Sequence, residues 1–232
     1  MDRIDKVQGT FDARGTKKDL PPSAAAIARL PRYYRVLCAL IEDGVLRISS
    51  GELGEKMGLT ASQVRQDFRH FGDFGQQGYG YQVKYLHRKI GALLGREEQY
   101  HAVIVGSSPV AELLIKTGML ARAGLDCVAW ITHCEEPETR GSSLPSYPWS
   151  ARETALREHP AEVAILCTPP EVARETVGAL TTLGVRGIFN CTGVPLPHLT
   201  DKVFTRDFAP EETLYHLLYD LTQDTKTKDT PT

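Results

Sequence analysis

The sequence ISSGELGEKMGLTASQVRQDFRHFGDFGQQGYGY, residues 48–81, decides the fold of the N-terminal part of this chain. Ser49 and Ser50 can cap a helix through Glu52, because a serine side chain and an acidic residue three positions later satisfy each other's backbone N–H groups. Gly58 then ends this helix, since glycine tolerates the left-handed backbone of a helix terminus. The segment therefore begins with one short helix.

A second helix follows directly. Thr60 lies three residues before Gln63, which is capping-box spacing, so a helix is predicted over residues 61–71. Two short helices joined by a tight turn are typical of a helix-turn-helix. The apolar residues of the second helix recur at helical spacing and are expected to face the core: Val64, Phe68 and Phe71.

The other face of the second helix is polar and carries side chains that can read DNA. Arginine can pair with guanine, glutamine can pair with adenine, and small hydroxyls can reach phosphates. A solvated helix face is the alternative interpretation. The side chains predicted to contact DNA are Ser62, Gln63, Arg65, Gln66 and Arg69 on this helix, with the hydroxyls of Ser49, Ser50 and Thr60.

A glycine-rich aromatic run follows the second helix. Glycines at 72, 75, 78 and 80 allow positive φ and close backbone approach, which suits the β-hairpin of a wing. Gln76 and Gln77 stand at the expected tip, where they can reach a phosphate or the minor groove. A polar loop without a DNA contact is the alternative.

Length and composition set limits on the class of protein. The 232 residues, 41% of them hydrophobic, suit one large or two ordinary domains with buried cores. No apolar run approaches membrane-spanning length and the charged N-terminus lacks an export signal, so a cytoplasmic protein is expected, with residues 1–19 as a disordered tail. Five cysteines without a C-x-x-C pattern indicate reduced thiols, and His133 beside Cys134 is too few ligands to predict a metal site.

The small net charge of −2 conceals an asymmetry between the two halves. Residues 21–100 hold 11 Lys and Arg against 8 Asp and Glu, whereas residues 101–232 hold 11 against 17. Only the first part suits a polyanion, and its excess is modest. A dimer that presents two small reading heads is therefore expected, rather than one broad basic patch.

Beyond a polar stretch at residues 95–99 the pattern changes to alternating short apolar strands and helices. This alternation predicts a parallel, doubly wound sheet, so the fold class is α/β with an N-terminal winged helix-turn-helix domain. The expected strands cover residues 100–105, 126–131, 163–167, 187–190 and 203–205, and the expected helices cover residues 83–94, 109–123 and 170–183.

The turn after the first of these strands partly matches the dinucleotide fingerprint G-x-G-x-x-G/A. Ser108 replaces the second glycine, and Thr132 or His133 stands where an acidic residue would bind the ribose. A strand-to-helix turn that binds no nucleotide is the alternative. The matching segment is Gly106-Ser107-Ser108-Pro109-Val110-Ala111.

Over about 200 residues this order of motifs resembles the Rex family of redox-sensing transcriptional repressors. The resemblance implies a homodimer with an N-terminal winged helix, a C-terminal Rossmann-like domain and a terminal helix that is exchanged between subunits. It also implies binding to an inverted-repeat DNA operator, which NAD⁺ permits and NADH releases. The segments that carry it are IARLPRYYRVL (27–37), RISSGELGEKMGLTASQVRQDF (47–68), FGQQGYGYQV (74–83), VAILCTPPEVARE (163–175) and GVRGIFN (184–190).

The resemblance also assigns roles to single residues. Arg35, Tyr81 and Asp207 match positions that couple cofactor to DNA; helix capping by Asp207 and a surface role for Arg35 are the structural alternatives. Cys-Thr-Gly follows Asn190 where the family usually has Phe-Ala-Pro beside the nicotinamide. Besides the residues of the fingerprint, Thr132 and His133, the positions expected to bind NAD(H) are Thr168, Pro169 and Asn190.

The last helix is predicted to make the dimer. Its apolar stripe is broader than a surface helix at a chain end requires, so it should pack against a partner or against its own domain. The expected organisation is a winged-helix domain at 20–95, a ligand-sensing domain at 96–208, a dimerisation helix at 209–223 and a disordered tail at 224–232. The stripe consists of Leu214, Leu217, Leu218 and Leu221, broadened by Tyr215 and Tyr219.

Three functions are compatible with these features. A Rex-type repressor that senses the NADH/NAD⁺ ratio is the first, and a regulator of the same build with weakened NAD(H) binding or another effector is the second. An NAD-dependent dehydrogenase is a distant third, because no histidine pairs recognisably with a carboxylate and no substrate domain is present. The chain is therefore predicted not to be an enzyme.

Overall fold

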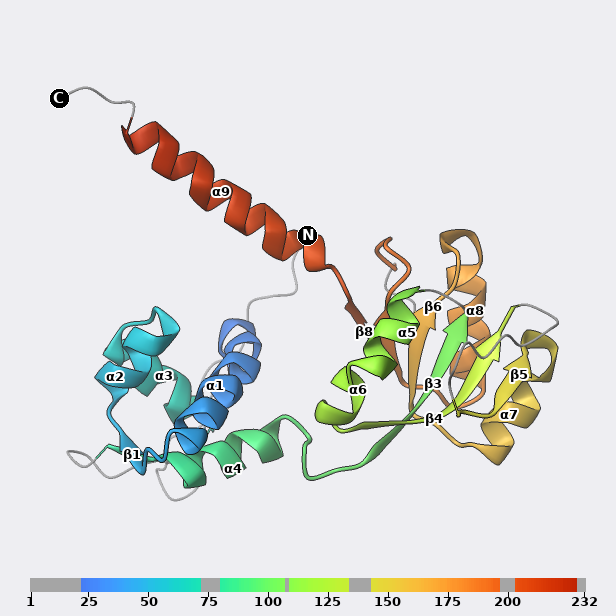
Figure 1. The fold of residues 1–232 in the computed structure, drawn as a ribbon. Helices are drawn as coiled ribbons and strands as arrows, with labels where there is room; N and C mark the ends of the chain where they lie inside the picture. Colours follow the sequence, from blue (N-terminus) through green and yellow to red (C-terminus); the bar gives the residue numbers. More distant parts are fainter. Residues whose placement is uncertain (1–21, 72–79, 107–108, 134–142, 197–202, 229–232) are drawn as a thin grey trace, which may run out of the picture. The chain divides into compact units, whose positions relative to one another are not determined.

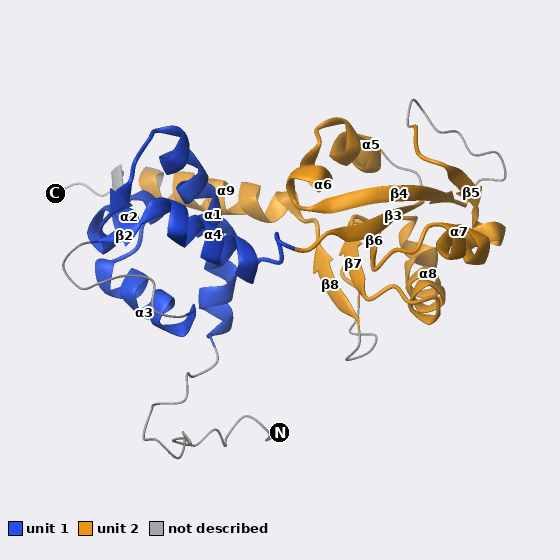
Figure 2. Ribbon diagram, turned by 90° about the horizontal axis from the view of Figure 1, so that it is seen from below, with its two compact units in different colours: residues 1–97 blue, residues 98–232 orange. Residues whose placement is uncertain are grey.

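The computed structural model describes residues 22–71, 80–106, 109–133, 143–196 and 203–228. The chain divides into two compact units, residues 1–97 and 98–232. Figure 2 shows them in different colours. In the described part of the chain, no helix is both long and apolar enough to cross a membrane.

The first unit is mostly helical. Its elements are α1 (Ala24–Glu42), β1 (Arg47–Ile48), α2 (Ser50–Met57), α3 (Ala61–Phe71), β2 (Tyr81–Gln82) and α4 (Val83–Leu93). Figure 1 labels the four helices and β1, and Figure 2 labels β2. The expected helix-turn-helix is confirmed, because the Ser49 capping box starts α2 and Gly58, at φ +64°, ends it. Thr60 caps α3 by accepting a hydrogen bond from the backbone N–H of Gln63 at 3.1 Å.

The two strands of the first unit form an antiparallel pair, with Ile48 opposite Tyr81. Gly80 precedes β2 with φ +68°, and a Cβ there would lie 2.8 Å from the carbonyl oxygen of Ile48. Glycine is therefore required for this close approach. The expected wing hairpin over residues 72–79, with Gln76 and Gln77, lies outside the described residues.

The second unit is a three-layer α/β/α domain. Its elements are β3 (Tyr100–Gly106), α5 (Pro109–Lys116), α6 (Met119–Arg122), β4 (Leu125–Thr132), β5 (Ser146–Pro148), α7 (Arg152–Glu158), β6 (Val163–Cys167), α8 (Pro170–Thr182), β7 (Gly187–Asn190), β8 (Phe204–Asp207) and α9 (Pro210–Lys228). The strands form one parallel sheet in the order β5-β4-β3-β6-β7-β8. This order is that of a Rossmann fold.

The central strands β3 and β6 are largely buried on both faces. Val103 and Val105 of β3 pack with α7 and α8 on one face, whereas Ala102 and Ile104 pack with α5 and α6 on the other. Figure 2 shows α5 and α6 on the opposite side of the sheet from α8. Alternate residues of each strand therefore anchor different helical layers.

Some boundaries differ from the prediction. The helix expected over 109–123 is interrupted at Gly118, whose φ of +64° ends α5 and starts α6. Strand β5 and helix α7 were not expected. A three-residue strand that contains Pro148 is too short to show alternating apolar residues. Helix α9 continues to Lys228, whereas the sequence predicted an end at residue 223.

Candidate DNA interface and cofactor site

The outer face of α3 is available to a ligand. Ser62, Arg65, Gln66 and Arg69 are exposed, whereas Val64 and Phe68 are buried and Phe71 is half-buried. Four of the five predicted α3 contacts therefore lie on one solvent face, which has the donor and acceptor groups that major-groove reading requires.

Gln63 does not lie on this face, contrary to expectation. It is half-buried, and its side-chain Nε2 donates a hydrogen bond to Oδ1 of Asp67 at 3.0 Å. The reason is that Asp67, one turn later, is 1% exposed and needs donors for its carboxylate. The amide of Gln63 is therefore used inside the domain.

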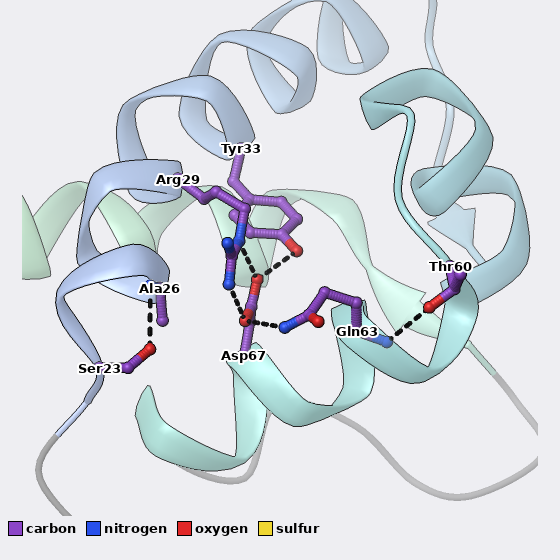
Figure 3. A network of polar contacts seen from close by, with 7 residues as sticks. All are labelled: Ser23, Ala26, Arg29, Tyr33, Thr60, Gln63 and Asp67. Carbon is purple, nitrogen blue, oxygen red and sulfur yellow. Dashed lines mark hydrogen bonds and ion pairs between the residues drawn. The ribbon is translucent and has the colours of Figure 1, made fainter.

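Asp67 is the centre of a network that joins α1 to α3 (Figure 3). Arg29 of α1 donates from Nε and Nη2 to the two carboxylate oxygens, both at 2.7 Å, and the Tyr33 hydroxyl donates to Oδ2 at 2.9 Å. Burial alone would raise the pKa of Asp67, but the hydrogen bonds from Arg29, Gln63 and Tyr33 lower it below its usual value. Burial and Asp67 in turn raise the pKa of Tyr33.

Sequence reasoning missed this network. Asp67 follows Val64 by three residues and precedes Phe68, so helical spacing alone places it on the buried side of α3. Arg29 and Tyr33 are one turn apart on α1, which is the spacing that two side chains need to reach one partner. A charged residue on an apolar helix face was the signal that could have found it.

The predicted cap hydroxyls have structural roles already. Ser49 accepts from the backbone N–H of Glu52 at 3.1 Å, and Ser50 accepts from Nη1 of Arg65 at 2.9 Å. The Arg65 bond crosses from α3 to α2 on the exposed side. It holds the guanidinium near the start of α2, so Ser50 and Arg65 belong to one surface.

Tyr81 lies beside α3. Its ring packs edge-on against Phe68 with centroids 5.0 Å apart. Desolvation raises the pKa of its hydroxyl, and the charges of Arg65 and Arg69 oppose that rise. The cations that act on this phenol therefore come from α3, whereas Arg35 is exposed on α1.

The carboxyl edge of the sheet in the second unit supplies the dinucleotide turn. Gly106 ends β3 with φ +98°, and a Cβ there would collide with the backbone of Cys167 at the end of β6. Its carbonyl oxygen accepts a hydrogen bond from Nε1 of Trp130 at 2.6 Å. Ala111 is fully buried where α5 meets the sheet, and Val110 is half-buried after the exposed Pro109. Ser107 and Ser108 lie outside the described residues.

The neighbouring strand ends carry the other expected cofactor residues. Thr132 and Thr168 are each 4% exposed, and the hydroxyl of Thr168 has no hydrogen-bond partner among the described residues. A buried polar group of this kind can be satisfied by a ligand or by water. Pro169 is exposed before α8, and His133 is exposed and stacks on Trp149 at 4.8 Å. The donor set fits a polar dinucleotide, with the phosphate-loop residues outside the described ranges.

The structure brings Asn190 and Asp207 together. Parallel pairing of β7 with β8 places them opposite each other, and Asn190 Nδ2 donates to Asp207 Oδ1 at 2.6 Å. The Asn190 amide also donates to the carbonyl of Val194 at 2.8 Å and accepts from Thr192 Oγ1 at 2.7 Å. This cluster borders a cavity of about 100 Å³ whose lining includes Phe208.

Helix α9 carries an exposed apolar surface. The six residues of its predicted stripe are between 54% and 64% exposed. They are Leu214, Tyr215, Leu217, Leu218, Tyr219 and Leu221.

Comparisons with known proteins place the chain in a family. A family model described as "Putative DNA-binding protein N-terminus" matches residues 22–68. The protein named redox-sensing transcriptional repressor Rex from Clostridium beijerinckii is 38% identical over 200 residues, which cover 85% of this chain and 93% of the relative. Its namesake from Clostridioides difficile is 33% identical over 82% of this chain and 96% of its own length.

Solved structures agree with these relatives. A crystal structure of RSP in complex with β-NAD⁺ and operator DNA matches with a TM-score of 0.78 and 32% identity, covering 89% of this chain and 95% of RSP. RSP, described as a Rex-family repressor, matches in another crystal structure with a TM-score of 0.80 and 30% identity over 89% of this chain and 96% of RSP. A further structure holds RSP with β-NADH and matches with a TM-score of 0.80 and 28% identity, covering 89% of this chain and 97% of RSP. The chain belongs to the Rex family of redox-sensing transcriptional repressors.

Proposed function

We propose that this protein represses transcription as a homodimer that binds an inverted-repeat operator and releases it when NADH binds. The observation that carries the DNA half is the exposed face of α3, which presents Arg65, Gln66 and Arg69 while the Asp67 network anchors the opposite face to α1. Support for the whole comes from RSP, which matches over both units and was crystallised with operator DNA and with NADH.

The cofactor half rests on the carboxyl edge of the sheet. The turn at Gly106 brings β3 against β6 as a dinucleotide fold requires, and Thr168 offers a buried hydroxyl beside it. When bound, the nicotinamide ring would distinguish NAD⁺ from NADH, because the oxidised ring is positively charged and the reduced ring is neutral. Gly106, Ala111 and Thr168 would bind and orient the dinucleotide, while Asn190 holds the loop after β7.

Coupling requires an element with two states. We place it at Tyr81, whose phenol lies near Arg65 and Arg69 of α3, and at Asp207, whose carboxylate is bonded to Asn190 in the cofactor domain. In the proposed switch, the Tyr81 hydroxyl exchanges a partner in the DNA-binding domain, with Arg35 as the candidate, for Asp207 of the second subunit. The apolar stripe of α9 docks on that subunit and makes the dimer.

The curated relatives are named transcriptional repressors, which favours a regulator over the third candidate, a dehydrogenase. The family consists of repressors, and we infer that this chain is a regulator without turnover. A regulator that prefers a different dinucleotide is favoured by one observation: Thr132 is buried and uncharged where the ribose-binding acid is expected.

Two binding experiments test the proposal. A duplex selected by the protein from a random pool should contain an inverted repeat, and it should bind at least about 10³-fold more tightly than random DNA at fixed salt. Calorimetry should show a saturable dinucleotide site. A protein that selects no sequence, or binds no dinucleotide, would contradict the corresponding half of the proposal.

A further inference from the structure

The ends of β4 and β5 hold a basic cluster that the proposed function does not use. The two strands pair in parallel with Thr132 opposite Pro148, so both end at the carboxyl edge where a Rossmann sheet receives its ligand. His133 and Trp149 directly follow this pair, and their rings stack with centroids 4.8 Å apart and an interplanar angle of 30°. Arg152 places its guanidinium carbon 4.9 Å from the centroid of the Trp149 ring.

The Arg152 guanidinium has one hydrogen bond to the backbone and one nitrogen without a hydrogen-bond partner among the described residues. Its Nη1 donates to the carbonyl of Trp149 at 3.2 Å, while its Nε is buried without a hydrogen-bond partner among the residues that the structure describes. The residue is half-buried rather than fully enclosed, and a planar guanidinium suits the oxygens of a phosphate.

The neighbouring position removes the group that would reject such a phosphate. In NAD-binding Rossmann domains an acidic residue at the end of the second strand bonds the ribose 2′-hydroxyl, and an arginine nearby instead accommodates a 2′-phosphate. Thr132 stands at this strand end, 4% exposed and uncharged. A 2′-phosphate at this strand end would therefore meet no carboxylate at position 132, while Arg152 and His133 each pack against the ring of Trp149.

We propose that Arg152 and His133, packed on Trp149, form a subsite for the 2′-phosphate of NADP(H). This inference rests on the proposed dinucleotide site and specifies its ligand: the protein takes the phosphorylated dinucleotide at least as well as NAD(H). The regulator then reports the NADPH pool in addition to the NADH pool.

One charge opposes this assignment. Desolvation lowers the pKa of His133, and Glu175 of α8 partly offsets that by raising it. The positive charge of the subsite therefore comes from Arg152 at neutral pH, and His133 adds to it as the pH falls. Replacing Glu175 with Gln should strengthen NADPH binding at neutral pH by removing a repulsive charge.

The test uses the full-length protein and four probes: NADH, NADPH, 5′-ADP and 2′,5′-ADP. Calorimetry should show NADPH binding no more weakly than NADH, and 2′,5′-ADP binding more tightly than 5′-ADP. Arg152→Met should weaken NADPH and 2′,5′-ADP by about tenfold or more, as loss of a charge-assisted hydrogen bond does, with NADH changed less than about twofold. Thr132→Asp should reverse the preference toward NADH.

Arg157→Met is the matched control, because exposed Arg157 lies on the same helix and its guanidinium donates to the hydroxyl of Thr154. Thermal unfolding of each variant shows whether the Trp149 packing survives. Tight NADH binding with rejection of NADPH would overturn the subsite and leave the proposed function standing, as would an Arg152→Met variant that loses both dinucleotides equally. Failure of all four probes to bind would contradict the dinucleotide site itself.

Discussion

At position 67 a carboxylate that is 1% exposed accepts four hydrogen bonds, two from Arg29, one from Tyr33 and one from Gln63. Because Arg29 and Tyr33 belong to α1, these bonds connect α3 directly to α1. A buried ion pair contributes little net stability compared with apolar packing, and its clearest use is to select one arrangement. We interpret Asp67 as the residue that orients the DNA-reading face.

Substitutions can separate orientation from stability. Asp67→Ala should lower the free energy of unfolding by about 3 kcal/mol, because Arg29 and Tyr33 lose their partner. The combined change Arg29→Met, Tyr33→Phe and Asp67→Leu should restore stability to within about 1 kcal/mol, yet reduce the ratio of selected-operator to random-DNA affinity. Denaturant unfolding and DNA titrations measure the two quantities. An unchanged ratio in the triple variant would show that the network only stabilises.

The stability that the Asp67 network contributes depends on pH. The pKa of Asp67 is lowered in the folded state, so its contribution to stability is present above the unfolded pKa and is lost as the pH falls through the folded pKa. The triple variant should therefore lose less stability than the wild type on acidification.

Arg65 is the residue expected to read a base. It is exposed on α3 and is held toward α2 by its bond to Ser50. Arg65→Ala should cost about 1–3 kcal/mol of operator affinity while random-DNA affinity falls less. Exposed Lys56→Ala, on α2, serves as a charge-matched control. Equal losses of affinity for operator and for random DNA would indicate that Arg65 contacts a phosphate rather than a base.

At the scale of elements, the sequence predicted correctly those helix ends that are set by residues close together in the chain. The spacing of Thr60 and Gln63 predicted the start of α3, and Gly58 predicted the end of α2. The break at Gly118 and the strand β5 were missed, because their signals are one residue and three residues long. The Asn190 to Asp207 contact depends on the pairing of β7 with β8, which no local pattern contains.

The terminal helix α9 carries an exposed apolar stripe. If the stripe of α9 is the dimer contact, deleting residues 210–232 should give monomers with greatly weakened operator affinity, because one particle no longer engages both half-sites. Leu217→Glu with Leu218→Glu should act in the same way in the intact chain. Exposed His216→Glu, on the opposite side of α9, is the control. Sedimentation measures the oligomeric state of each variant. A truncated protein that remains a tight dimer would show that the interface lies elsewhere.

At the scale of the whole molecule, the chain consists of two units: residues 1–97, which carry the candidate DNA interface, and residues 98–232, which carry the candidate dinucleotide site. Each unit can be analysed from its own residues, whereas the proposed coupling would need residues from both, with Tyr81 in the first and Asp207 in the second. Coupling of two ligands is reciprocal, so NADH should weaken operator binding by the same factor as operator weakens NADH binding.

The most direct test measures operator affinity by fluorescence anisotropy at fixed salt, with saturating NADH, NADPH or NAD⁺. We expect each reduced dinucleotide to weaken operator binding by a factor of about 5–150, the usual range of coupling, with little change on NAD⁺. Tyr81→Phe should still bind operator and NADH separately but lose most of this factor. Operator affinity that is independent of every dinucleotide, in a protein that binds them, would contradict the account.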